Sequence, residues 1–329
     1  MELTKKIKIA LDETRMLILG AQILLGFQFR GVFDNGYDQL PSHLRYLDGI
    51  TLLPMICVVA LLITPGPYHR IVETGEDSQS FNRLVTVIIN LALLPFAIAL
   101  GLDVVVTTAS IFGAMPGAGA GIAVAAVAVA FWYGFPHLRK RHNPEQERLM
   151  RFPDSEKPAS TPLDVRIEQM LTEARVILPG AQALFGFQLA IVFTQSFGQL
   201  ATASMLVHAT SLLLVALAVV LLMAPAAYHR IVYDGEMSED MHWIGGLLVT
   251  VATIPLALGL AGDTYVVIGK IAASPTAAIV AAGAAFTLLI GLWHAYPLVA
   301  AFIRRRPGES LAPPPRGEEP VRSPANWHR

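Results

Sequence analysis

The sequence predicts an all-α integral membrane protein with eight transmembrane helices, built as two parallel four-helix repeats, with both termini in the cytoplasm. Three observations predict this fold. Hydrophobic residues form 54% of the chain and charged residues only 15%, whereas soluble domains carry about a quarter charged residues. Short motifs recur at a constant offset of 160 residues. Lysine and arginine gather on one side of the expected spans.

The repeat is carried by matched motifs that run through most of the chain. A repeat has to be identified before single elements are assigned, because missing it leads to the wrong fold. The pattern indicates a tandem duplication of one four-span unit, which makes the chain a pseudo-dimer. The matched motifs are Glu13-x-Arg15 with Glu173-x-Arg175, Gly20-Ala21-Gln22 with Gly180-Ala181-Gln182, Gly26-Phe27-Gln28 with Gly186-Phe187-Gln188, and Pro65-x-x-Tyr68-His69-Arg70-Ile71-Val72 with Pro225-x-x-Tyr228-His229-Arg230-Ile231-Val232.

Each repeat contains four apolar runs near the length of a transmembrane helix, about 20 residues. Leucines and isoleucines at helical spacing precede the first run of each repeat, which predicts amphipathic turns on the cytoplasmic surface. The expected domains are a first repeat over 1–137, a charged linker over 138–160, a second repeat over 161–303 and a disordered, proline-rich tail over 304–329. The expected spans are 16–33, 47–66, 84–102, 117–137, 176–197, 203–224, 243–261 and 276–300.

Orientation follows from the positive-inside rule. The loops of one side carry nearly all lysines and arginines, whereas the other side carries only Arg45 and Lys270, with Arg30 near the end of its span. Four spans per repeat is an even number, so the repeats share one orientation and are expected around a pseudo-two-fold axis along the membrane normal. We expect a multi-pass protein of the plasma membrane, with the lipid bilayer as its partner. A net charge of −1 gives no basic field for nucleic acid.

Two glutamines on the first span of each repeat are candidates for a polar path: Gln22 and Gln28, then Gln182 and Gln188. Polar side chains in a bilayer are costly and usually face the bundle interior. There the amides would line a path or coordinate an ion through their carbonyl oxygens. The alternative is that each glutamine hydrogen-bonds a neighbouring helix while glycine permits close approach, which is the commoner use of such residues.

A polar layer is expected at the cytoplasmic ends of the spans. Tyrosine suits the membrane interface, arginine obeys the positive-inside rule, and histidine is suited to pH sensing or proton transfer. The layer is either a salt-bridged cap on the helix ends, or a gate or a site for anionic lipid headgroups. Its residues are Glu13, Arg15, Tyr68, His69, Arg70, Glu76, Glu173, Arg175, Tyr228, His229, Arg230 and Glu236.

Two further features lie on the third and fourth spans of each repeat. Asp103 and Asp263 are expected at the outer ends of the third spans, where they either attract cations or, more commonly, cap a helix or turn. The fourth spans are rich in small residues, and Gly117-x-x-x-Gly121 is a close-packing pattern. These spans are therefore expected to be tightly packed scaffold helices.

Several signatures of catalysis and coupling are missing from the sequence. No carboxylate is expected near the midplane of any span, although cation-coupled antiporters normally depend on one. The sequence has no phosphate-binding glycine loop with lysine, no His/Cys cluster at metal-ligand spacing and no nucleophile elbow. We expect no cofactor and no metal, and we do not expect an enzyme; the one enzymatic alternative is a lipid-acting protein that uses the cytoplasmic layer.

The four matched motifs resemble those of a family of small actinobacterial membrane proteins of unknown function. Its members look like single four-span units, and some are labelled sodium:proton antiporters. The resemblance covers about residues 3–136 and 163–297 and brings no established mechanism. It implies a fused version of two such units. The halves have also diverged, since Arg30 corresponds to Ala190.

Three functional hypotheses follow. The first is a transporter or channel for a small ion or solute, with a path between the repeats lined by the four glutamines. His69, Arg70, His229 and Arg230 would form its cytoplasmic mouth. The second is a membrane scaffold whose charged layer binds another protein. The third is a lipid-binding or lipid-modifying protein that uses the same layer.

Overall fold

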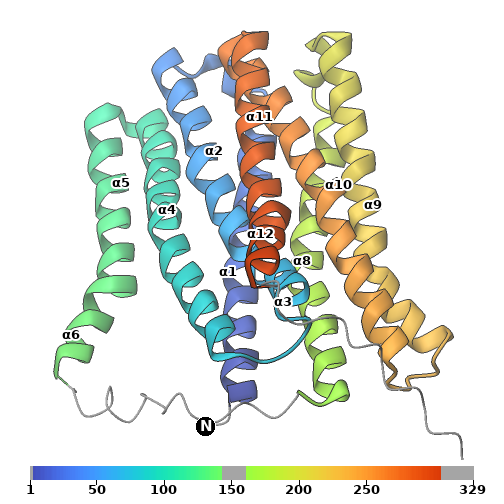
Figure 1. The fold of residues 1–329 in the computed structure, drawn as a ribbon. Coiled ribbons are helices and arrows are strands. Elements are labelled where there is room, and N and C mark those ends of the chain that lie inside the picture. Colours follow the sequence, from blue (N-terminus) through green and yellow to red (C-terminus); the bar gives the residue numbers. More distant parts are fainter. Residues whose placement is uncertain (1–2, 143–160, 305–329) are drawn as a thin grey trace, which may run out of the picture.

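The computed structural model describes residues 3–142 and 161–304, and within these residues all regular structure is helical (Figure 1). The all-α prediction is confirmed. Most of the predicted linker, 143–160, and nearly all of the predicted disordered tail, 305–329, lie outside the described residues.

The two repeats have matching element orders, except that α3 has no separate counterpart in the second repeat. The first repeat comprises α1 (Leu3–Gly31), η1 (Tyr37–Gln39), α2 (Ser42–Ile63), α3 (Pro65–Ile71), α4 (Gln79–Phe112), α5 (Ala114–Val129), the π-helical turn η2 (Ala130–Gly134) and α6 (Phe135–His142). The second comprises α8 (Leu163–Ile191), η3 (Phe197–Gln199), α9 (Thr202–Ile231), α10 (Glu239–Ala272), α11 (Pro275–Ile290), the π-helical turn η4 (Gly291–Ala295) and α12 (Tyr296–Arg304).

Seven helical segments of the described chain are long and apolar enough to cross a membrane. The exception is α1, which carries several charges in its first half. Both α1 and α8 run without a break from the expected amphipathic turns into the expected span, and α4 and α10 each continue about ten residues beyond the predicted span ends. We call the end of the bundle where α1 and α8 begin the inner end, and the opposite end the outer end.

The two repeats meet along α1 and α8, which pack side by side through the centre of the bundle (Figure 1). Gly180 on α8 allows this approach, because a Cβ at that position would overlap the Gln22 side chain on α1. Ile18, Leu25 and Leu184 are fully or almost fully buried in the same core. The duplicated first helices therefore form the axis of the molecule.

The fourth helices of the repeats have different surroundings. In the second repeat, α11, η4 and α12 contact α2 and α3 of the first repeat, whereas α5 contacts α4 and stands at the edge of the bundle (Figure 1). Gly117 and Gly121 are the buried residues of α5, and a Cβ on either would clash with α4. The close-packing pattern is confirmed, but most of α5 is exposed, so it is not a central scaffold helix.

The second helices differ at the inner end. In the first repeat the helix breaks at Thr64 and restarts as the seven-residue α3, whereas α9 continues through Pro225 to Ile231. The first repeat has Pro65-Gly66-Pro67 where the second has Pro225-Ala226-Ala227. Proline lacks the amide hydrogen that an inner helical turn needs, and glycine is a poor helix former. Two prolines and a glycine thus account for the break.

Candidate functional site

A buried ionic cluster joins the two repeats near the inner end. It consists of Glu173 on α8 with His69 and Arg70 on α3, and we call it the interface cluster. His69 Nδ1 lies 2.8 Å from Glu173 Oε1, and Arg70 Nη1 donates to Glu173 Oε2. The side chains of Glu173 and His69 are each 2% exposed and that of Arg70 is 8% exposed. Each repeat contributes to this cluster, so it can exist only at their contact.

The interface cluster extends into the second repeat through hydroxyl groups. Arg70 Nε donates to Thr250 Oγ1 on α10 at 2.7 Å. Thr253 donates to the Thr250 carbonyl at 2.7 Å, and its Oγ1 lies 2.9 Å from His294 Nε2 on η4. Polar contacts therefore run from α8 through α3 and α10 to the π-helical turn.

The interface cluster is not fully satisfied by the described residues. His69 Nε2 and Arg70 Nη2 are buried without a hydrogen-bond partner. A cavity of about 20 Å³ lies beside Glu173 and Gly66, large enough for about one water molecule. A buried charge that loses its partner is strongly destabilising. Removing Glu173 would therefore leave Arg70 as a buried charge without its ion-pair partner.

A second layer of contacts closes the same interface further toward the inner end. Arg304 Nη1 on α12 donates to Glu73 Oε1 at 2.8 Å, and the ring of Tyr68 stacks on that of Tyr296 with centroids 5.6 Å apart. Arg166 on α8 lies 3.9 Å from Glu76. The segment between α3 and α4 is thus fastened to both ends of the second repeat.

The equivalent residues on the opposite side of the pseudo-dimer do not meet. Glu13, which corresponds to Glu173, is exposed, as are Tyr228, Arg230 and Glu236. None of these four residues forms an ion pair with the described part of the chain. The predicted layer of twelve residues is therefore brought together on one side only, and Arg15 and Arg175 are exposed outside it.

Sequence differences between the repeats match this asymmetry. On the closed side, Gln169 Nε2 donates to Asp77 Oδ1 at 2.9 Å. The corresponding positions on the open side are Ile9 and Met237, which cannot form that bond. The closed interface is thus specified in part by one residue from each repeat, and neither residue has an equivalent in the other repeat.

The four predicted path residues occupy three kinds of surroundings. Gln22 is fully buried between α1 and α8, and its amide has no partner among the described residues. Gln28 and Gln188 are buried and donate to Asp103 and Asp263. Gln182 is exposed, and within the described residues its polar contact is with the sulfur of Met223 on α9, at 4.0 Å. The glutamines do not line one continuous cavity.

The two aspartates are not at helix ends, which corrects the expected capping role. Asp103 and Asp263 lie about two and a half turns before the last residues of α4 and α10. Gln28 Nε2 lies 2.9 and 3.0 Å from the two Asp103 oxygens, and Gln188 Nε2 lies 2.6 Å from Asp263 Oδ2. The sequence pointed to the aspartates and to the glutamines separately. It did not show that α4 and α10 extend past the aspartates, and so it did not show that they meet the glutamines.

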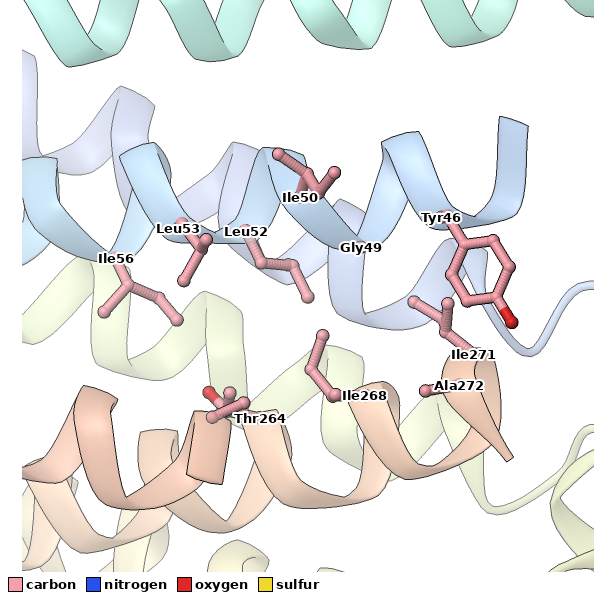
Figure 2. Close-up of a pocket in the computed structure, with 11 residues that line it drawn as sticks. Tyr46, Gly49, Ile50, Leu52, Leu53, Ile56, Thr264, Ile268, Ile271 and Ala272 are labelled. Carbon is pink, nitrogen blue, oxygen red and sulfur yellow. The ribbon is translucent and has the colours of Figure 1, made fainter. Parts of the chain in front are cut away.

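An apolar crevice opens between the repeats at the outer end (Figure 2). It has a volume of about 210 Å³ and lies between α2 and α10, with Ala281 of α11 on its wall. Gly49 leaves room for Ile268 and Ile271, whose nearest atoms would be 3.3–3.6 Å from an added Cβ. Below the crevice, the fully buried Trp293 donates to the Ala60 carbonyl at 2.9 Å and fills the space between the repeats.

Comparison with family models gives one match, a family of unknown function, DUF6328, over residues 2–136 and 156–297. The chain belongs to the DUF6328 family. The two matched segments fall on the two repeats of this DUF6328 protein. No curated protein and no solved structure matches the chain.

Several residues in and around the interface cluster of this DUF6328 protein were absent from the sequence predictions. Thr250, Thr253 and His294 continue the interface cluster, and Glu73 and Arg304 close the layer beyond it. Thr250 and Thr253 lie in an apolar run, where threonine commonly bonds its own helix backbone. The sequence did distinguish Thr253, because this polar residue stands where the first repeat has the apolar Leu93.

Proposed function

We propose that this DUF6328 protein transports a small solute or ion across the plasma membrane along the contact between its repeats. The observation that carries this proposal is that one interface is open in its outer half and locked in its inner half. The crevice between α2 and α10 supplies the opening, and the interface cluster of Glu173, His69 and Arg70 supplies the lock. A transport protein needs such a gate on each side of its path.

The proposed topology places both termini and the inner end in the cytoplasm. It rests on the distribution of lysine and arginine between the loops. The interface cluster is then the cytoplasmic gate, and the crevice faces outward. The eight long helices, α1 included, would span the membrane as two parallel repeats.

The lining of the crevice favours an apolar or amphipathic solute over a bare ion. Ile56, Ile268 and Ile271 line it, and Thr264 is one of its few polar residues, with its hydroxyl donating to the Leu260 carbonyl. An ion entering the crevice would lose its hydration shell with few polar groups to replace it. The proposed path therefore differs from the glutamine-lined path predicted from the sequence.

A non-transporting membrane scaffold is the second candidate. It is favoured by the burial of Gln22, Gln28 and Gln188 in helix contacts, which is the common structural use of glutamine between membrane helices. In this case the interface cluster would simply hold the repeats together. A flux measurement separates the two candidates.

The experiment is solute flux in proteoliposomes across a panel of protons, alkali cations, halides and small amphipathic solutes. The native protein is expected to move at least one amphipathic solute. Gly49→Leu should abolish that flux, because its side chain fills the crevice. Gly119→Leu on α5 is the matched control, since nothing lies within 4 Å of an added Cβ there. Absence of flux for every member of the panel, or equal flux in both variants, contradicts the proposal.

A further inference from the structure

An open groove lies in the inner half of the first repeat, between α4 and the segment formed by α5 and η2. It has a volume of about 540 Å³. Its polar residues are Asn90 on α4 and Tyr133 on η2. Asn90 Nδ2 donates to the Thr86 carbonyl at 2.8 Å, and its Oδ1 accepts no hydrogen bond from the described residues. The apolar walls are formed by Val87, Leu91, Leu94 and Val129.

The second repeat has the same surface, and there a helix from the other repeat covers it. Asn90 corresponds to Thr250 on α10. Tyr133 corresponds to His294, since each is the fourth residue of its π-helical turn. Thr250 Oγ1 accepts a hydrogen bond from Arg70 on α3, and both α10 and η4 contact α3. This surface therefore receives the inner end of a second helix from another repeat.

The helix end that corresponds to α3 is left uncovered in the second repeat. Tyr228 and Ile231, at the inner end of α9, are 41% and 82% exposed, whereas Tyr68 on α3 is 6% exposed. The groove of the same chain is out of reach, because α5 and α9 stand at opposite edges of the bundle (Figure 1). The inner end of an α9 can therefore reach this groove only from another chain.

Aromatic side chains on the two surfaces correspond to a contact of the closed side. There the ring of Tyr68 stacks on that of Tyr296, the first residue of α12. The corresponding residues are Tyr228 and Phe135, the first residue of α6, and Phe135 is 57% exposed. Within the chain, each of these two rings contacts an aromatic neighbour close to it in the sequence. A second copy would bring the two exposed rings together.

One pair of opposite charges is also divided between these surfaces. On the closed side Arg70 pairs with Glu173 on α8. The corresponding residues are Arg230 on α9 and Glu13 on α1, and both are exposed. Neither forms an ion pair in the described part of the chain. Glu13 belongs to the repeat that holds the groove, so a second copy would place Arg230 near it.

We propose that two copies of this chain assemble side by side, with the inner end of α9 of each copy seated in the α4–α5 groove of the other. Each copy has both the groove and the helix end, so a two-fold axis fills both grooves at once. The contact between the repeats of one chain is then repeated between the chains. This proposal stands whether or not the protein transports solutes.

Lipid is the alternative occupant of the groove. Acyl chains would cover its apolar walls, but they offer no hydrogen-bond donor to the free Oδ1 of Asn90. A second copy supplies that donor, because Arg230 would stand to Asn90 as Arg70 stands to Thr250. The polar groups of the two surfaces therefore favour a second copy over lipid.

Cross-linking of the full-length protein in native membranes tests the proposal. Phe135→Cys and Tyr228→Cys are combined, with Cys57 replaced by Ser, and the membranes are treated with a short bismaleimide. We expect a product of twice the mass, in which mass spectrometry finds residue 135 joined to residue 228. Either substitution alone should give no such product, because the two-fold axis keeps the two copies of each residue apart.

Phe302 supplies a matched control, since it is 79% exposed on α12 at the same end of the bundle. Random collisions between chains would join a cysteine there at least as readily as one at Phe135. Phe302→Cys with Tyr228→Cys should therefore give no product of twice the mass.

A charge exchange tests the orientation of the two copies. Adding Arg230→Glu to the pair at 135 and 228 should lower the yield of the product, because two acidic side chains would then face each other. Adding Glu13→Arg as well should restore the yield. A yield that Arg230→Glu leaves unchanged contradicts the proposed contact.

Three further results would overturn the proposal. The first is no product of twice the mass from the pair at 135 and 228, which means that lipid covers the groove. The second is a product of another mass, which means that a different protein occupies the groove or that the copies join head to tail. The third is an equal yield from the Phe302 control, which means that the chains meet by random collision.

Discussion

At the scale of single residues, corresponding positions of the two repeats have opposite surroundings. Glu173 is 2% exposed and bound to two basic side chains, whereas Glu13 is exposed. Replacing Glu173 by Gln leaves Arg70 as a buried charge without its partner, and removing one partner of a buried pair costs about 3–5 kcal/mol. We predict a loss of that size in the free energy of unfolding in detergent micelles, and a change within about 0.5 kcal/mol for Glu13→Gln. Equal effects would show that the two sides are equivalent.

A second pair of residues tests the contact between α1 and α8. A Cβ on Gly180 would overlap the Gln22 amide, whereas a Cβ on Gly20 would meet nothing within 4 Å. Gly180→Ala should therefore lower the midpoint of thermal unfolding, while Gly20→Ala should leave it unchanged or raise it slightly, since alanine is the better helix former. If Gly20→Ala is the more damaging change, the placement of Gln22 at this contact is wrong.

At the scale of elements, the break between α2 and α3 brings His69 and Arg70 to Glu173. The corresponding α9 does not break, and neither His229 nor Arg230 on it forms an ion pair in the described part of the chain. Pro67→Ala should restore a backbone hydrogen bond of the helix. It should therefore favour one continuous helix over α2 and α3, as in α9. Pulsed EPR between spin labels at Val72 on the C-terminal side of α3 and Phe302 on α12 should then give a broader and longer distance distribution. Ala227→Pro in α9 is the control and should leave this distribution unchanged.

The elements themselves were largely predictable, and their partners were not. Apolar runs of the right length predicted each long helix. Hydropathy ended the third spans at 102 and 261, because Asp103 and Asp263 look like terminal residues, and so their bonds to Gln28 and Gln188 were missed. A carboxylate with an amide partner is tolerated inside a helical bundle, which residue-by-residue hydropathy does not register.

At the scale of the whole molecule, the repeat predicted the duplicated architecture but also implied an interface with two equal sides. The structure closes one side and leaves the other open. The differences that decide this are small: Gly66-Pro67 against Ala226-Ala227, and Gln169 with Asp77 against Ile9 with Met237. Each is visible in the sequence, but its effect depends on contacts between residues far apart in the chain. The three residues of the interface cluster were therefore predictable as part of a group, whereas their pairing and the residues that extend the cluster were not.

The central claim is that the interface cluster closes the path between the repeats on the cytoplasmic side. It is tested most directly by the reactivity of one cysteine at Ile268, in the crevice, with Cys57 replaced by Ser. A membrane-impermeant thiol reagent is applied to sealed vesicles of each orientation. We predict reaction from the outer side only in the otherwise native protein, and from both sides once Glu173→Gln is added. Glu13→Gln should not admit the reagent from the cytoplasmic side. The claim would be contradicted if Glu173→Gln did not change the reaction of the cysteine with reagent from the cytoplasmic side. It would also be contradicted if Glu13→Gln raised this reaction equally.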